Sequence, residues 1–214
     1  MFTGIIEGAY AVQGVEDVGG IRRISIDLST LADSASVKLG DSVALNGCCL
    51  TVATLNHGVA MFEAVPETLR LTNLGDLKKD SLVNVERAMQ AGARIDGHLV
   101  QGHVDQVGKV MLIKSGDDFR IRVGCGREFA AQCIQKGSVC VDGISLTIAE
   151  IEQDNLTVAV IPHTREVTNI RAWAVGTRVN LEADMIGKYV RRRLDQMTDG
   201  KVDEDLLRRA GFTP

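Results

Sequence analysis

The alternation of apolar and polar residues predicts short β-strands through most of this chain. In the first half the predicted strands lie in the stretches RRISIDL, SVALNG, CCLTVATL, VAMFEAV and SLVNVE, which are rich in β-branched residues and separated by turn residues. Asn46-Gly47 and Asp142-Gly143 are strong signals for tight hairpin turns, because both central positions tolerate a positive φ. No long helical pattern occurs before residue 185, so the pattern indicates a protein built mainly from β-strands.

The same pattern occurs twice along the chain. The stretch SVALNGCCLTVA at 42–53 returns 96 positions later as SVCVDGISLTIA at 138–149, and VNVE at 83–86 returns as VNLE. Nearer the start the offset is 98, where Gly4 meets Gly102. Such ordered similarity indicates an internal duplication. We therefore predict two tandem domains, residues 1–96 and 97–185, followed by a tail at 186–214.

Each repeat has the strand content of a small closed barrel. Five or six short antiparallel strands in one repeat would leave exposed edges in an open sheet, and closure removes those edges. The predicted fold class is therefore all-β, with two tandem antiparallel barrels that arise from the internal repeat.

The tail has a different periodicity. From Met185 onward, apolar residues follow helical spacing and form one stripe, which consists of Ile186, Tyr189, Val190, Leu194 and Met197. This pattern predicts a C-terminal α-helix. Two interpretations stay open, since the stripe must be buried somewhere: packing on the chain's own barrels, or contact with another subunit, which we favour.

Composition and charge exclude several classes of function. The chain has 214 residues, of which 45% are hydrophobic and 24% charged, and its net charge is −4. This balance gives no basic footprint, so we expect neither nucleic-acid nor membrane binding. The N-terminal stretch lacks the pattern of a signal peptide, and five cysteines without an export signal favour reduced thiols. We therefore expect a cytoplasmic protein.

The duplicated strand carries the first candidate chemistry. If residues 48–52 form a strand, Cys48 faces the barrel core, whereas Cys49 and Thr51 face outward. The second copy places Ser145 and Thr147 on the same outward face. Small thiol and hydroxyl groups suit a flat polar ligand, although an ordinary solvated strand face would look similar.

The histidines do not form a metal-binding pattern. His98 and His103 lie five positions apart in GHLVQGH, a spacing that places them on opposite sides of a strand. We therefore expect no metal site. His103 stands where the first repeat has Ile5, so the two repeats differ in chemistry at this position.

The motifs MFTGIIE, LNGCCLTV, ETLRLTNLGDL, VNVERA, DGHLVQGHVD and DGISLTI together resemble the riboflavin synthase family of the α-subunit type. The resemblance covers residues 1 to 185. It implies that each barrel is a six-stranded Greek-key domain that binds one molecule of 6,7-dimethyl-8-ribityllumazine.

The resemblance also implies the reaction and the assembly. As the last step of riboflavin biosynthesis, a transferase of this family moves four carbons between two lumazines and yields riboflavin and 5-amino-6-(D-ribitylamino)uracil. No cofactor or metal takes part. The family forms homotrimers in which the N-terminal barrel of one chain faces the C-terminal barrel of a neighbour. The sequence leaves open whether the protein associates with lumazine synthase.

The family's site pattern can be transferred to this sequence residue by residue. We expect catalytic roles for Cys49, His103, Ser145 and Asp184, with His103 in proton transfer and Asp184 as an orienting group. The first barrel's substrate-binding candidates are Phe2, Thr3, Gly4, Ile5, Ile6, Cys48, Leu50, Thr51, Glu63, Ala64, Val65, Pro66, Glu67 and Thr68. Those of the second barrel are Gln101, Gly102, Lys136, Leu146, Thr147, Val160, Ile161, Pro162, His163, Thr164 and Arg165.

A second function would use the same fold. A non-catalytic lumazine or flavin carrier, such as a light-emission antenna, could be built on the same two barrels. Such a protein would be expected to lose the pocket pattern from one barrel. Both CCLT and SLT are intact in this sequence, which favours the enzyme.

Overall fold

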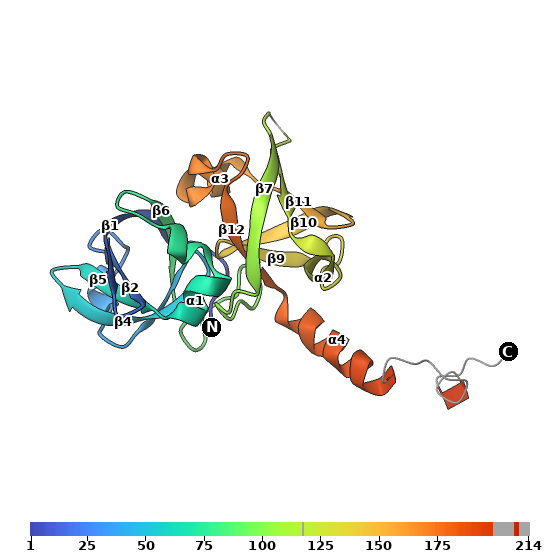
Figure 1. Cartoon of the computed structure of the whole chain (residues 1–214), viewed down its shortest axis with the longest axis horizontal. Coiled ribbons are helices and arrows are strands. Elements are labelled where there is room, and N and C mark those ends of the chain that lie inside the picture. Colours follow the sequence, from blue (N-terminus) through green and yellow to red (C-terminus); the bar gives the residue numbers. More distant parts are fainter. Residues whose placement is uncertain (117, 199–207, 210–214) are drawn as a thin grey trace.

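The computed structural model describes residues 1–116, 118–198 and 208–209. Two closed six-stranded barrels lie side by side, and the N-terminus lies between them (Figure 1). Both barrels have the same antiparallel strand order, β1-β2-β5-β4-β3-β6 in the first and β7-β8-β11-β10-β9-β12 in the second. The predicted pair of closed barrels is therefore confirmed.

The strands occupy equivalent places in the two repeats. Those of the first barrel are β1 (Gly8–Val18), β2 (Ile21–Asp27), β3 (Ser42–Leu45), β4 (Cys48–Asn56), β5 (Val59–Ala64) and β6 (Leu82–Arg87). Those of the second are β7 (Gln106–Lys114), β8 (Arg120–Gly124), β9 (Ser138–Val141), β10 (Ile144–Glu152), β11 (Asn155–Ala159) and β12 (Arg178–Ala183).

Short helices connect the strands. The α-helices are α1 (Pro66–Leu71), α2 (Gly126–Ala130), α3 (Pro162–Val167) and α4 (Met185–Thr198), and the 3₁₀ turns are η1 (Ser34–Ser36), η2 (Asn73–Asp76) and η3 (Asn169–Ala172). Pro66 and Pro162 occupy the first turn of α1 and α3. A proline fits there because its missing N–H would have no partner in the helix.

The barrel interiors follow the predicted period of two. Along β4 the side chains of Cys48, Leu50 and Val52 are buried in the first core, whereas Thr51 is exposed. On β10 the corresponding core positions are taken by Ile144, Leu146 and Ile148. The strand register assumed from the sequence is therefore confirmed.

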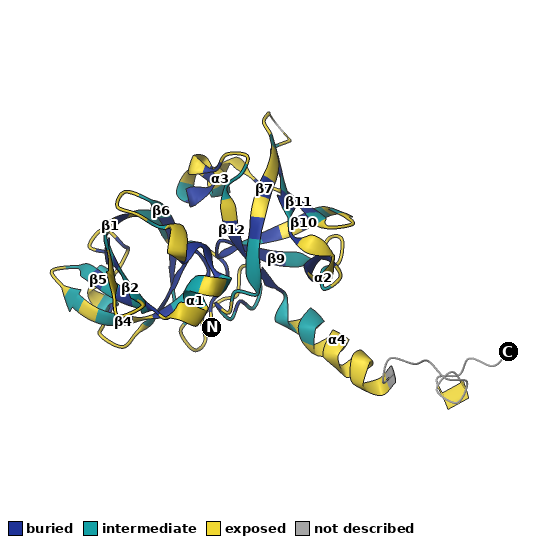
Figure 2. Ribbon diagram, viewed as in Figure 1, coloured by how far each residue is buried: buried dark blue, intermediate teal, exposed yellow. Residues whose placement is uncertain are grey.

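The helix α4 extends away from both barrels (Figure 1). Lys188 in its first turns donates to the Asp105 carboxylate at 2.7 Å, which ties the helix to the second barrel. The predicted apolar stripe is exposed, and Figure 2 shows α4 as intermediate in parts of its first turns and exposed beyond them. The members of the stripe are Ile186, Tyr189, Val190, Leu194 and Met197. The rest of the predicted tail, apart from 208–209, lies outside the described residues.

None of the helices in the described part of the chain has the length and apolar character needed to span a bilayer.

The two barrels meet at their hairpin turns. A Cβ placed on Gly47 would lie 2.6 Å from the Gly143 nitrogen, so both turns require glycine where they touch. The contact follows the sequence repeat, since these glycines are equivalent at offset 96. The chain therefore has an internal pseudo-twofold axis that passes between the turns.

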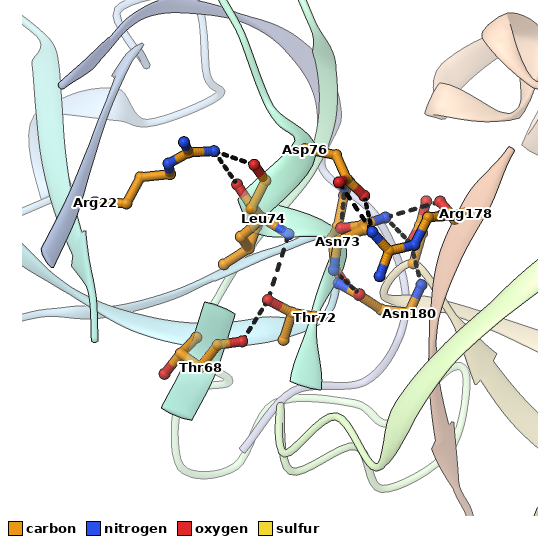
Figure 3. A network of polar contacts seen from close by, with 11 residues as sticks. Arg22, Thr68, Thr72, Asn73, Leu74, Asp76, Arg178 and Asn180 are labelled. Carbon is orange, nitrogen blue, oxygen red and sulfur yellow. Dashed lines mark hydrogen bonds and ion pairs between the residues drawn. The ribbon is translucent and has the colours of Figure 1, made fainter. Parts of the chain in front are cut away.

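A buried polar network surrounds this axis. Asn73 donates its backbone N–H to Asn180 at 2.6 Å, and Arg178 pairs with Asp76 at 2.7 Å nearer the surface (Figure 3). The buried members are Asn46, Asn73, Asn84, Asp142, Asn169 and Asn180. These residues form three pairs under the repeat, and the only chemical difference within a pair is Asn46 against Asp142. Such a satisfied network fixes how one barrel sits on the other.

Candidate functional site

Two short segments cross between the barrels beside the axis. We call residues 1–6 the first arm and residues 99–104 the second arm, since they correspond at offset 98. Phe2 and Val100 form an antiparallel bridge in which each donates its N–H to the other, at 2.7 and 3.0 Å. Phe2 is fully buried in a small cluster with Val100, Ala44 and Cys140.

The second arm covers the outward face of β4. The Cys49 N–H donates to the Gly102 carbonyl at 2.9 Å. A Cβ on Gly102 would lie 2.6 Å from the Cys49 Cβ, so only glycine allows this approach. His103 follows directly and is exposed. One candidate site therefore combines Cys49 and Thr51 with His103.

The first arm covers the matching face of β10. The Ser145 N–H donates to the Gly4 carbonyl at 2.8 Å, and a Cβ on Gly4 would meet the Ser145 Cβ at 2.6 Å. Ile5 follows and is exposed. The second candidate site therefore combines Ser145 and Thr147 with Ile5.

These contacts correct one expectation from the sequence. The family pattern assigned Gly4 to Ile6 to the first barrel and Gln101 to His103 to the second, but the arms are exchanged. Ile6 packs against the core of the second barrel, and Val104 packs against that of the first. The arms bridge each other beside the pseudo-twofold axis, so each one lies against the strand of the opposite barrel.

Ser145 has a partner that the sequence did not single out. The His98 Nδ1 lies 2.7 Å from the Ser145 Oγ, although the two residues are 47 positions apart. Burial lowers the pKa of the His98 imidazole, and the charge of Asp184 partly opposes this shift. A neutral imidazole beside a hydroxyl can accept its proton.

Two buried carboxylates hold the arms. Glu86 accepts from the Thr3 and Gly4 N–H groups, and Glu182 accepts from those of Gln101 and Gly102. Burial raises the pKa of both carboxyls, while these backbone hydrogen bonds oppose the shift. Neither glutamate was a candidate from the sequence.

Several other candidates lie on or beside the short helices or in exposed positions. Val65 and Ile161 are exposed at equivalent positions just before α1 and α3. The helices themselves carry Pro66, Glu67, Thr68, Pro162, His163, Thr164 and Arg165. Lys136 is also exposed, and its N–H donates to Ile148. A cavity of about 540 Å³ opens beside the first arm, lined in part by Thr3, Ile5, Ser42 and Glu86.

A third set of candidates has its side chains inside the protein. The members are Phe2, Cys48, Leu50, Ala64, Leu146 and Val160. Burial raises the pKa of the Cys48 thiol to about 12, which disfavours the reactive thiolate. These residues position the faces by packing, and only their backbones can reach a ligand.

Two charged candidates already have partners within the chain. Glu63 forms an ion pair with Arg23 at 3.0 Å. The Arg165 guanidinium lies 4.7 Å from the centre of the Phe119 ring. Within residues 1–116, 118–198 and 208–209, no three side chains of the metal-binding types gather at one place.

Comparisons with known proteins agree with this architecture. The family model described as the lumazine binding domain matches residues 3–88 and again residues 101–184. Riboflavin synthase from Bacillus amyloliquefaciens is 39% identical over 96% of this chain and 95% of its own length. That of Mycobacterium bovis is 42% identical over 90% of this chain and 97% of its own length. The chain belongs to the riboflavin synthase family.

A solved structure shows the same fold at lower identity. The crystal structure of LumP complexed with 6,7-dimethyl-8-(1'-D-ribityl) lumazine superimposes with a TM-score of 0.76 at 22% identity, over 86% of this chain and 99% of that one. The two matches to the lumazine binding domain coincide with the two barrels. The curated relatives that span nearly the whole chain are riboflavin synthases, so this chain is an enzyme of the riboflavin synthase type.

Proposed function

We propose that the chain dismutates two molecules of 6,7-dimethyl-8-ribityllumazine, giving riboflavin and 5-amino-6-(D-ribitylamino)uracil. A four-carbon unit leaves one lumazine and joins the other. Every atom and electron of the products comes from the two substrates, so the reaction needs no oxidant, reductant or group donor.

The observation that carries this proposal is the duplicated small polar face. Cys49 and Thr51 on β4 repeat as Ser145 and Thr147 on β10, and both pairs face away from their barrel core. Two similar ligands require two similar sites. Holding two reactants in fixed orientation replaces a bimolecular encounter and supplies much of the rate acceleration.

The two sites differ where the two substrates must behave differently. One lumazine loses a proton from its 7-methyl group, and the other is attacked at its ring. The His98 and Ser145 pair supports a base at the β10 site, because the imidazole is within hydrogen-bond distance of the hydroxyl. Cys49 supplies a thiol at the β4 site, and His103 follows Gly102, which packs on Cys49. The charge of Asp184 raises the pKa of the His98 imidazole and so favours its protonated form.

The assembly completes the site in this proposal. The stripe of α4, residues 186–197, is exposed, and an amphipathic helix of this kind gains stability by burying its stripe. We propose a homotrimer built on α4, in which the β4 face of one chain meets the β10 face of a neighbour. A cytoplasmic location stays a prediction, and an association with lumazine synthase stays open.

One assay tests the function. Purified protein is mixed with 6,7-dimethyl-8-ribityllumazine alone, after dialysis against a chelator, and riboflavin absorbance is followed. We expect one riboflavin for every two lumazines consumed. Binding of lumazine without turnover would overturn the proposed reaction. Activity that needs an added metal would contradict its cofactor-free form.

A further inference from the structure

We propose that Glu86 and Glu182 are positioning residues, each of which holds one arm in place over the ligand face of the opposite barrel. The inference rests on the proposed function only in naming those two faces as ligand faces. The geometry itself is independent of any ligand.

Glu86 binds three donors of the first arm. Its Oε1 accepts from the Thr3 N–H at 2.6 Å and from the Thr3 hydroxyl at 2.8 Å, and its Oε2 accepts from the Gly4 N–H at 3.0 Å. Glu86 is 5% exposed. A carboxylate this deeply buried is costly unless hydrogen bonds satisfy it, so the arm and the carboxylate depend on each other.

Glu182 repeats the arrangement in the second barrel. Its Oε1 accepts from the Gln101 N–H at 2.8 Å and its Oε2 from the Gly102 N–H at 3.1 Å. Glu182 is 3% exposed. The charge of Lys188 lowers the pKa of Glu182 and the charge of Asp105 raises it. The charge of Glu7 raises the pKa of Glu86.

Each arm therefore connects two barrels through opposite sides of its backbone. The N–H groups of the first arm bind Glu86 on β6, and the Gly4 carbonyl binds Ser145 on β10. The second arm binds Glu182 on β12, and its Gly102 carbonyl binds Cys49 on β4. As a result, Glu86 of the first barrel positions the Ser145 site, and Glu182 of the second positions the Cys49 site.

Glutamate is required because both of its oxygens accept. In Glu86→Gln or Glu182→Gln, an NH₂ group replaces one oxygen and faces a backbone N–H, so one donor of the arm loses its partner. The side-chain size is nearly unchanged. The substitution therefore loosens the arm without opening a cavity in either core.

The test is backbone hydrogen exchange on the full-length protein, read at two amides. We expect Glu182→Gln to accelerate exchange at the Cys49 N–H by about tenfold or more and to leave the Ser145 N–H unchanged. Glu86→Gln should do the reverse. The matched control is Glu152→Gln, an exposed glutamate paired with Arg122, which should change neither amide.

Alkylation of the Cys49 thiol, followed by peptide mass spectrometry, gives a second measurement. Glu182→Gln should raise the rate and Glu86→Gln should not. Should a Gln variant fail to fold, Thr3→Val removes the hydroxyl that donates to Glu86 and accepts from the Ile5 N–H. This variant should accelerate exchange at Ser145 alone. Equal effects on both amides, or none, would overturn the proposal.

Turnover separates this inference from the proposed function. If the amides respond crosswise while the wild-type protein does not convert lumazine, the arms are positioned as described and the proposed function fails. If lumazine is converted but the amides do not respond, the function stands and the positioning role is wrong. With both correct, Glu86→Gln and Glu182→Gln should each lower kcat.

Discussion

Replacing Asp142 with asparagine should weaken the contact between the barrels, although the two side chains have almost the same shape. The Asp142 Oδ1 accepts from the Asn180 N–H at 2.7 Å and from the Asn73 Nδ2 at 2.9 Å, and its Oδ2 accepts from the Asn169 Nδ2 at 3.0 Å. Asp142 is 1% exposed. All three of these bonds require an acceptor, and an amide offers only one oxygen.

The neighbours cannot rearrange freely to accept the new NH₂ group. It would face the NH₂ of Asn169, whose own oxygen already accepts from Asn84 at 2.9 Å. Rotating the Asn169 amide would in turn break its bond to Asn46 at 3.1 Å. One buried donor is left without a partner in each case, so we expect a loss of about 1–3 kcal/mol at a pH where Asp142 is ionised.

The pseudo-twofold axis offers a matched control. Asn46→Asp should also destabilise, because it places two carboxylates in one buried network. The double variant Asn46→Asp with Asp142→Asn moves the single carboxylate to the equivalent position, where Asn73 and Asn169 can exchange roles by rotating their amides. We expect it to recover at least about 1 kcal/mol relative to the sum of the single losses.

Urea unfolding monitored by fluorescence gives the four free energies. Trp173 is the only tryptophan in the chain and lines a hollow of about 400 Å³ above the network together with Asp142. Its emission should therefore report separation of the barrels. Strictly additive losses in the double variant would refute the reasoning, since they would mean that the position of the charge does not matter to the network.

Two further predictions follow from the same structure. Cys48→Ser should lower the free energy of unfolding by about 1–3 kcal/mol and keep the turnover per folded molecule. Cys49→Ala should leave the melting temperature unchanged and lower the single-turnover rate at least about tenfold. The opposite pattern would contradict the assignment of the two faces. Deleting residues 186–214 should yield a monomer in sedimentation with little activity, and a fully active monomer would refute the shared site.

The sequence predicted the barrels because the determining interactions are local. The period of two along 48–52 decides which side chains enter the core, and Asn46-Gly47 decides where the hairpin turns. The repeat then extends each inference to the second barrel. The buried Cys48 and the exposed Thr51 were both predictable on this basis.

The composition of the sites was harder to predict because it depends on contacts across the axis. The sequence repeat aligns Gly4 with Gly102 but does not say which barrel each arm covers. Likewise, nothing within residues 97–105 indicates that His98, rather than His103, lies beside Ser145. The spacing between the arm and its glutamate is similar in the two repeats, 82 positions from Gly4 to Glu86 and 80 from Gly102 to Glu182. This similarity gains a meaning only after the structure shows the contacts.

The exchanged arms also explain how two similar sites can differ. A symmetric dimer of one barrel would place identical residues at both faces, and the two lumazines would meet identical groups. In the fused chain, the first repeat delivers Ile5 to the Ser145 face, and the second repeat delivers His103 to the Cys49 face. Each site therefore combines residues from both repeats, so a single substitution in one arm alters only one of the two sites. Under the proposed reaction, this arrangement would let one site bind the donor and the other the acceptor while both keep the same barrel.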